Sequence, residues 1–173
     1  MEVMEESEGR QSGSGLSLLG FLGVGGALCA LLLNHPMMTS AMDTSSVNQQ
    51  YVSIARQDAV RVGIDQNLFV NQIYKESSFN PNAVSPTGAI GIAQFMPATA
   101  ADLGIDPYNP EQSLQAAAQL MAQYQQQYGD SDKALAAYNA GPGAVNSAVD
   151  RCGAGWMQCL PSETQSYISE VEQ

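Results

Sequence analysis

Histidine and basic residues are scarce in this sequence. Of its 173 residues one is histidine, His35, and six are lysine or arginine against 17 acidic residues, which gives a formal net charge of -11. One imidazole cannot build a zinc site from several histidines, and it leaves no well-placed base for a Ser/His/Asp or Cys/His catalytic arrangement. The negative charge lacks the basic footprint that binds nucleic acid. We therefore expect no metal site, no cofactor and no nucleic-acid partner.

Cysteine is also sparse, and its three residues are unevenly placed. Cys29 lies inside an apolar run, whereas Cys152 and Cys159 lie in a loop-like stretch with six residues between them. That pair, with no histidine nearby, is a poor metal site, and a small disulfide loop would require an oxidising compartment. Because the sequence does not show the geometry a disulfide needs, a bond and two free thiols both stay open.

The first 48 residues differ in composition from the rest. Residues 1–14 are acidic and rich in Ser and Gly, and we expect a disordered tail. Residues 15–34 are apolar and uncharged, just long enough to cross a bilayer as a helix. Residues 35–48 are a polar linker. The pattern predicts a single N-terminal transmembrane helix before a catalytic domain at residues 49–173.

Two other interpretations of the apolar run are weaker. A cleaved signal peptide normally follows a positive segment, but here four glutamates precede the run and Arg10 alone opposes them. A lipid-modified Cys29 would prefer a small residue before it, and Leu28 is not small. Neither flank has the Lys/Arg excess that fixes membrane orientation.

Alternating strand patterns are missing after residue 48, and helical signals replace them. We expect helices at 51–62, after Asp65 as an N-cap, after the Asn109–Pro110 step as far as Gly129, and at 131–140. The last should open at Ser162, which has capping-box spacing to Gln165. The predicted class is mainly α.

Glu76 is the one carboxylate that the helical pattern places against the core. Phe69, Ile73 and Glu76 lie at positions i, i+4 and i+7, and Glu76 falls in the last turn of its helix. Burial and the negative end of the helix dipole should both raise its pKa, as a general acid requires. Most helical glutamates are solvated, so this pattern alone is weak.

Three short sequence motifs, here called phrases, are more specific than the helical pattern. They are ESSFNPNAVSPTGAIGIAQFMPATA at 76–100, LAAYNAGPGAV at 135–145 and SETQSYISEV at 162–171. Together, and in this order, they resemble the soluble lytic transglycosylase family over about residues 51–171. The resemblance implies a compact, lysozyme-like helical fold and an enzyme that cuts peptidoglycan glycan strands.

The first phrase would supply the catalytic residue and part of the sugar-binding cleft. Glu76 matches the family's acid/base, and Ser85 matches a serine close to the acid and substrate, although a turn role explains it equally well. Gln94 matches a glutamine that reaches into the cleft. Met96 matches an apolar cleft residue, with core packing as the alternative.

The other two phrases would complete the cleft. Tyr138 matches a phenol that supports the catalytic carboxyl, and Asn139 an amide that binds substrate, although an Asn here would otherwise indicate a helix cap. Glu163 and Tyr167 match the ET-x-x-Y phrase, whose glutamate lines the cleft; Glu163 could instead be a first-turn residue stabilised by the helix dipole.

The sequence departs from the plainest family pattern between residues 150 and 160. This stretch holds Cys152, Trp156 and Cys159 and could form a disulfide-closed flap beside the cleft. Trp156 could stack on a sugar or pack under its own loop, and the second is slightly favoured.

The implied reaction cleaves the MurNAc-GlcNAc β-1,4 bond and forms a 1,6-anhydro-muramic product with Glu76 as sole acid/base. Two other functions stay open: a non-catalytic membrane-anchored protein that binds peptidoglycan or serves in assembly, and a hydrolytic muramidase. The expected partners are the glycan strand and, through residues 15–34, a membrane. The expected location is the periplasmic side of an envelope, an envelope-spanning apparatus, or the virion membrane of a phage.

Overall fold

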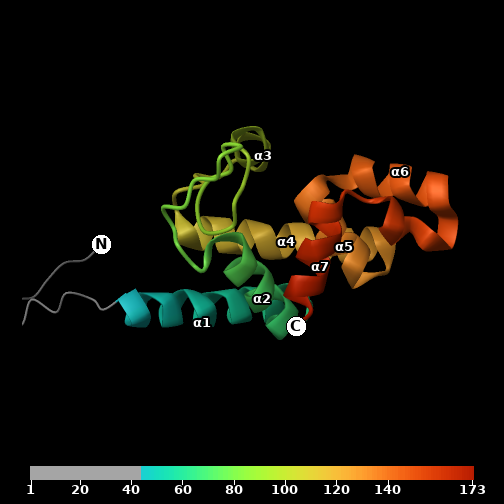
Figure 1. The fold of residues 1–173 in the computed structure, drawn as a ribbon. Coiled ribbons are helices and arrows are strands. Elements are labelled where there is room, and N and C mark those ends of the chain that lie inside the picture. Colours follow the sequence, from blue (N-terminus) through green and yellow to red (C-terminus); the bar gives the residue numbers. More distant parts are fainter. Residues whose placement is uncertain (1–43) are drawn as a thin grey trace, which may run out of the picture. The chain divides into compact units, whose positions relative to one another are not determined.

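A computed structural model describes residues 44–173, and these residues are mainly helical, as predicted (Figure 1). Within this part of the chain the only β-pairing is two isolated bridges, Val84 with Ile90 and Ile90 with Phe95. The helices are α1 (Thr44–Val62), α2 (Gln66–Ser77), α3 (Pro97–Leu103), α4 (Pro110–Tyr128), α5 (Ser131–Ala140), α6 (Pro142–Cys152), the 3-10 helix η1 (Gly153–Cys159) and α7 (Ser162–Val171).

The predicted acidic tail, transmembrane helix and most of the linker fall on residues 1–43, outside the described residues. Between residues 44 and 173, every helix is too short or too polar to cross a bilayer.

Local capping explains why several helices begin where the sequence predicted. The Asp65 carboxylate accepts a hydrogen bond from the Leu68 backbone N–H at 2.7 Å, and α2 begins at Gln66, the residue after Asp65. The Asn109 side chain accepts one from the Gln112 N–H at 3.1 Å, with Pro110 as the first residue of α4. The prediction of a helix at 131–140 is confirmed by α5.

Four local predictions need correction. The first helix begins at Thr44 instead of residue 51, so the boundary drawn between linker and catalytic domain at 48/49 lies inside α1. Helices α3 and α6 were not predicted; they begin at Pro97 and Pro142, and proline fits the first turn of a helix.

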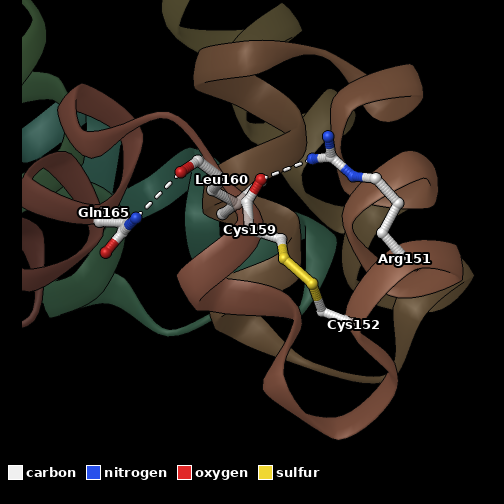
Figure 2. The surroundings of a disulfide bond; sticks show 5 residues. All are labelled: Arg151, Cys152, Cys159, Leu160 and Gln165. Atoms are coloured by element: carbon white, nitrogen blue, oxygen red, sulfur yellow. Dashed lines mark hydrogen bonds between the residues drawn. A yellow bond between two sulfur atoms is a disulfide. The ribbon is translucent and has the colours of Figure 1, made fainter.

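The fourth correction concerns the capping box at α7. Pro161 occupies the N-cap position without a side-chain cap, and Gln165 Nε2 instead donates to the Leu160 carbonyl at 2.9 Å (Figure 2).

Helix α4 lies at the centre of the packing and contacts both α1 and α5 (Figure 1). Its apolar stripe is buried at Leu114, Ala117, Ala118 and Met121. The small alanines let neighbouring helices approach closely, while the large side chains fill the remaining volume. The largest fully buried apolar side chains elsewhere in the core are Phe69, Ile73, Ile92, Leu135 and Ile168.

Helix α7, the last in the chain, packs against α2 and α5 (Figure 1). The Asn71 side chain donates to the Val171 carbonyl at 3.1 Å, and Lys75 forms an ion pair with Glu170. These contacts fix the position of α7 beside the last turns of α2, where Glu76 lies.

Cys152 and Cys159 form a disulfide that closes the η1 segment (Figure 2). The Arg151 guanidinium donates to the Cys159 carbonyl at 2.7 Å across the same loop. Trp156 is 8% exposed, and the Lys133 ammonium lies 5.4 Å from its ring centroid. Trp156 therefore packs under its own loop, the slightly favoured interpretation.

Candidate active site

A pocket of about 510 Å³ opens where the end of α2, the loop before α3, and helices α4, α5 and α7 meet. Seven of the eight residues predicted to act in catalysis or substrate binding line it: Glu76, Ser85, Gln94, Met96, Tyr138, Asn139 and Glu163. The eighth, Tyr167, is buried behind the pocket and contacts Glu76 directly. Three phrases far apart in sequence thus converge on one site. No residue of the 150–160 segment lines this pocket, so the disulfide-closed segment does not form part of the pocket wall.

Glu76 lies in the last turn of α2 with most of its carboxyl removed from water. Burial raises its pKa from 4.5 to about 7, and it outweighs the hydrogen bond from Tyr167 and the positive charge of Lys75, both of which lower the pKa. A large fraction of Glu76 is therefore protonated near neutral pH, which a general acid requires.

The hydrogen bond to the Glu76 carboxyl comes from Tyr167. Its hydroxyl donates to Glu76 Oε1 at 2.6 Å, and the two residues are 91 positions apart in sequence. The sequence comparison had assigned this support to Tyr138, but the Tyr138 hydroxyl donates to the Ala93 carbonyl at 2.7 Å. Tyr138 therefore fixes the loop opposite Glu76, and its ring lies 6.0 Å from that of Phe95.

Ser85 organises the turn at one wall of the pocket. Its hydroxyl accepts a hydrogen bond from the Ala89 N–H at 2.9 Å and lies 2.9 Å from the Thr87 hydroxyl. The Gly88 N–H also donates to the Ser85 carbonyl at 3.0 Å. The turn role is therefore present together with a position at the pocket wall.

Gln94 holds its own loop together from a left-handed backbone conformation, with φ at +52°. Its Nε2 donates to the Gly91 carbonyl at 2.8 Å and to the Ala83 carbonyl at 3.3 Å. Both amide protons are thereby used, so the side-chain oxygen is the atom that can bind a ligand. Ser77, next to Glu76, similarly donates to the Ile92 carbonyl at 2.7 Å.

Met96, Asn139 and Glu163 present exposed side chains at the pocket. Met96 is 45% exposed, which contradicts core packing as the explanation for it. Asn139 precedes the last residue of α5 and does not cap that helix, because Gly141 is the C-cap. Glu163 lies in the first turn of α7, where the helix dipole stabilises an acidic residue, and it also lines the pocket. Both explanations for this residue therefore hold.

The sequence analysis did not assign several further lining residues to the site, among them Thr87, Thr99, Leu120 and Tyr124. Leu120 and Tyr124 lie at positions i and i+4 of α4, so they form a second strip beside the core face, and both are partly buried. The signal available in the sequence was this i, i+4 spacing next to the apolar stripe of the same helix.

The raised pKa of Glu76 predicts a dependence of stability on pH. Because the folded protein holds this proton more tightly than the unfolded chain, the contribution is complete below about pH 4.5 and is lost as pH rises through about 7. Relative to Glu76→Gln, the wild-type free energy of unfolding should fall by roughly 2–3 kcal/mol across that interval. Denaturant unfolding of both proteins at several pH values measures this, and a constant difference would contradict the raised pKa.

Comparison with known proteins places this arrangement in a family. A model of the family described as "Transglycosylase SLT domain" matches residues 53–158. The transglycosylase of Enterobacteria phage PRD1 is 37% identical over 89 residues, covering 51% of this chain and 34% of that protein. Membrane-bound lytic murein transglycosylase C of Glaesserella parasuis is 32% identical over 135 residues, covering 66% and 36%. The chain thus spans about a third of the length of these two relatives.

Solved structures show the same fold. The 70 kDa soluble lytic transglycosylase of Escherichia coli aligns with a TM-score of 0.63 and 25% identity over 73% of this chain and 24% of that one. An inactive mutant of lytic transglycosylase Slt from Pseudomonas aeruginosa aligns with a TM-score of 0.62 and 24% identity, covering 73% and 23%. Because the family match covers more than half of its residues, this chain belongs to the transglycosylase SLT domain family.

Proposed function

We propose that the protein is a peptidoglycan lytic transglycosylase that cleaves the β-1,4 bond between N-acetylmuramic acid and N-acetylglucosamine. The observation that supports this most directly is that a partly buried carboxyl, Glu76, has its pKa raised to about 7 at a pocket of about 510 Å³. Such a group can both give and take a proton near neutral pH. The family to which the chain belongs supplies the reaction class.

In the first step, the protonated Glu76 carboxyl donates its proton to the bridging glycosidic oxygen. The bond between that oxygen and the anomeric carbon breaks, and the bond's electron pair leaves with the oxygen. The acetamido group of the substrate itself stabilises the positive anomeric carbon, which is substrate assistance. Glu76 is now a carboxylate, and the Tyr167 hydroxyl at 2.6 Å stabilises that charge.

In the second step, the Glu76 carboxylate accepts the proton of the C6 hydroxyl of the muramic sugar. The C6 oxygen attacks the anomeric carbon and closes the 1,6-anhydro ring, and Glu76 is protonated again. No water is consumed. A pKa of about 7 suits both steps, because the proton leaves and returns at comparable free-energy cost.

The remaining pocket residues are proposed to hold the glycan strand. Asn139 and the side-chain oxygen of Gln94 offer hydrogen bonds to sugar hydroxyl and acetamido groups, and exposed Met96 offers an apolar surface for a sugar face. Ser85 and Tyr138 keep the pocket walls in place through backbone contacts. An uncharged sugar backbone explains how a chain with a net charge of -11 can bind it.

A hydrolytic muramidase would need a second carboxylate at the pocket, and Glu163 is a candidate for it. Within the described residues it is the only other carboxylate lining the pocket with Glu76, and ordinary glycosidases use two carboxylates to activate water or attack the sugar. Family membership favours the transglycosylase instead, in which Glu163 lines the binding cleft. The product distinguishes the two reactions.

We further propose that the catalytic domain is tethered to a membrane through residues 15–34, with residues 1–14 as an acidic tail and residues 35–43 as linker. The uncharged composition of this run supports the anchor. The disulfide between Cys152 and Cys159 supports an oxidising compartment such as the periplasm. Relatives named as membrane-bound and as phage proteins support a bacterial envelope or a phage virion as the setting.

Mass spectrometry of soluble products tests the reaction. Purified peptidoglycan is incubated with the full-length chain, with Glu76→Gln or with Glu163→Gln. Anhydro-muropeptides that disappear with Glu76→Gln are expected. Products with a free reducing end that require Glu163 would establish a hydrolase, and no release by the wild-type chain would indicate a binding protein.

A further inference from the structure

Gln72 is a completely buried polar side chain one helical turn before Glu76. Its exposed fraction is 0%, and neither its Nε2 nor its Oε1 has a hydrogen-bond partner in the structure. An unpartnered buried amide is rare in proteins because its desolvation is not compensated. A leucine would fill this core position without that cost, so packing alone does not explain why a glutamine is found here.

The surroundings of Gln72 point to the catalytic carboxyl. Gln72 and Glu76 lie at positions i and i+4 of α2 and therefore share one face of the helix. Helix α7 packs against α2 and brings Tyr167, which is 5% exposed, to that face. Burial raises the pKa of Tyr167 well above its usual value, and the neighbouring Gln72 amide partly opposes that rise, although no atom pair has full hydrogen-bond geometry.

The phenol oxygen of Tyr167 has room for one more hydrogen bond. Its proton is given to Glu76 Oε1, which leaves the oxygen lone pairs to accept from a donor. A bond from the Gln72 amide to this oxygen would join the amide, the phenol and the carboxyl in one chain of hydrogen bonds, in which each bond polarises the next.

We infer that Gln72 is a positioning residue for Glu76, whose amide N–H donates to the Tyr167 oxygen and keeps the Tyr167 hydroxyl directed at the catalytic carboxyl. The role matters most after the first proton transfer, when Glu76 is charged and the hydrogen bond from Tyr167 strengthens. This inference rests on the proposed function, in which Glu76 alternates between acid and carboxylate.

Other groups face Glu76 and remain unchanged when Gln72 is replaced. Lys75 precedes it on α2 and lowers its pKa, half-buried Tyr138 faces it from α5, and Glu163 lines the same pocket from α7. The Tyr138 hydroxyl already donates to the Ala93 carbonyl. Tyr167 interacts with both Gln72 and the Glu76 carboxyl, so it is the connection that the test examines.

The test replaces Gln72 with methionine, which has a similar length and volume but no amide. In the full-length chain, Gln72→Met should raise the pKa of Glu76 by ~0.5, measured by carboxyl-carbon NMR, because the stabilised carboxylate loses support. The alkaline fall of kcat/KM, which reports loss of the Glu76 proton in the free enzyme, should move to higher pH by the same amount.

A double-mutant comparison identifies the route. In a Tyr167→Phe background, Gln72→Met should cause no further change in the midpoint of the Glu76 titration or of the alkaline fall of kcat/KM, because the connecting hydroxyl is absent. The matched control is Asp58→Asn on α1, another buried polar side chain with an unpartnered oxygen, which should leave both midpoints in place. Unchanged midpoints in Gln72→Met, or an equal shift with and without Tyr167, would overturn the inference.

A measurement on the wild-type chain covers the case in which Gln72→Met does not fold. The side-chain amide protons of Gln72 should shift with pH at the midpoint of Glu76, and should stop doing so in Tyr167→Phe; pH-independent amide signals in the wild type would also overturn the inference. The NMR titrations need no activity. If the wild-type chain releases no anhydro product, the proposed function fails while the role of Gln72 is still decided.

Discussion

Replacing Glu76 with glutamine should lower the rate of anhydro-muropeptide release by roughly 10²–10⁴-fold, because the amide can neither donate a proton to the glycosidic oxygen nor accept one from the C6 hydroxyl. KM should change little, since the amide has nearly the same shape and the lining residues of the pocket remain. Initial rates on purified glycan strands, followed by mass spectrometry, measure both parameters.

Glu163→Gln is the matched comparison, because it makes the same chemical change at the other carboxylate of the pocket. We expect it to reduce the rate by less than about tenfold, as loss of a binding group would. Equal losses in the two variants would contradict a sole acid/base. Glu76→Gln should also be more stable than the wild type at about pH 8, so a folding defect cannot explain its lost activity.

Gly91→Ala should cause the largest loss of stability of any single methyl addition in the loop that forms the pocket wall. A Cβ at Gly91 would lie 1.9 Å from the carbonyl oxygen of Pro107, and the backbone φ of +78° is unfavourable for any other residue. That carbonyl also accepts a hydrogen bond from the Ser113 hydroxyl at 3.2 Å, so it is held in place. The free energy of unfolding should fall by roughly 2–6 kcal/mol, from backbone strain plus overpacking.

Gly104→Ala separates the two contributions to that loss. Its φ is +66°, close to that of Gly91, but no atom lies within 4 Å of the added Cβ. In Gly104→Ala the free energy of unfolding should fall by about 1–2 kcal/mol, the cost of the left-handed backbone conformation alone. Denaturant unfolding compares the variants, and equal losses would show that the approach of Pro107 is unimportant. Gly91→Ala should also reduce activity, because Gly91 supplies the carbonyl that Gln94 binds.

Elements with a local signal in the sequence were predicted well. Asp65 and Asn109 are side-chain caps whose effect is confined to one helical turn, and the helices after them begin as expected. Helices α3 and α6, which begin at Pro97 and Pro142, were not predicted, because a proline is compatible with both the end of one helix and the first turn of another. Choosing between these requires tertiary packing that the local sequence does not contain.

The candidate site residues were chosen because three phrases resemble a family, and this resemblance did not give the contacts between them. Glu76, Ser85, Gln94 and Asn139 all line one pocket, while their roles in binding and catalysis stay predictions. Which tyrosine binds the carboxyl depends on how α7 docks on α2, a long-range contact that no sequence period encodes. Gln72 was missed for a related reason, since a polar residue in a helical stripe is normally assigned to the surface.

The hydrogen bond between Tyr167 and Glu76 gives the proposed active site an order of assembly. During synthesis Glu76 is translated 91 residues before the tyrosine that completes its surroundings. Until α7 emerges and docks on α2, Glu76 lacks both the Tyr167 hydroxyl and the cover of that helix. A nascent or prematurely ended chain therefore lacks the complete site, and the proposed cleavage of the cell wall requires α7 to be in place.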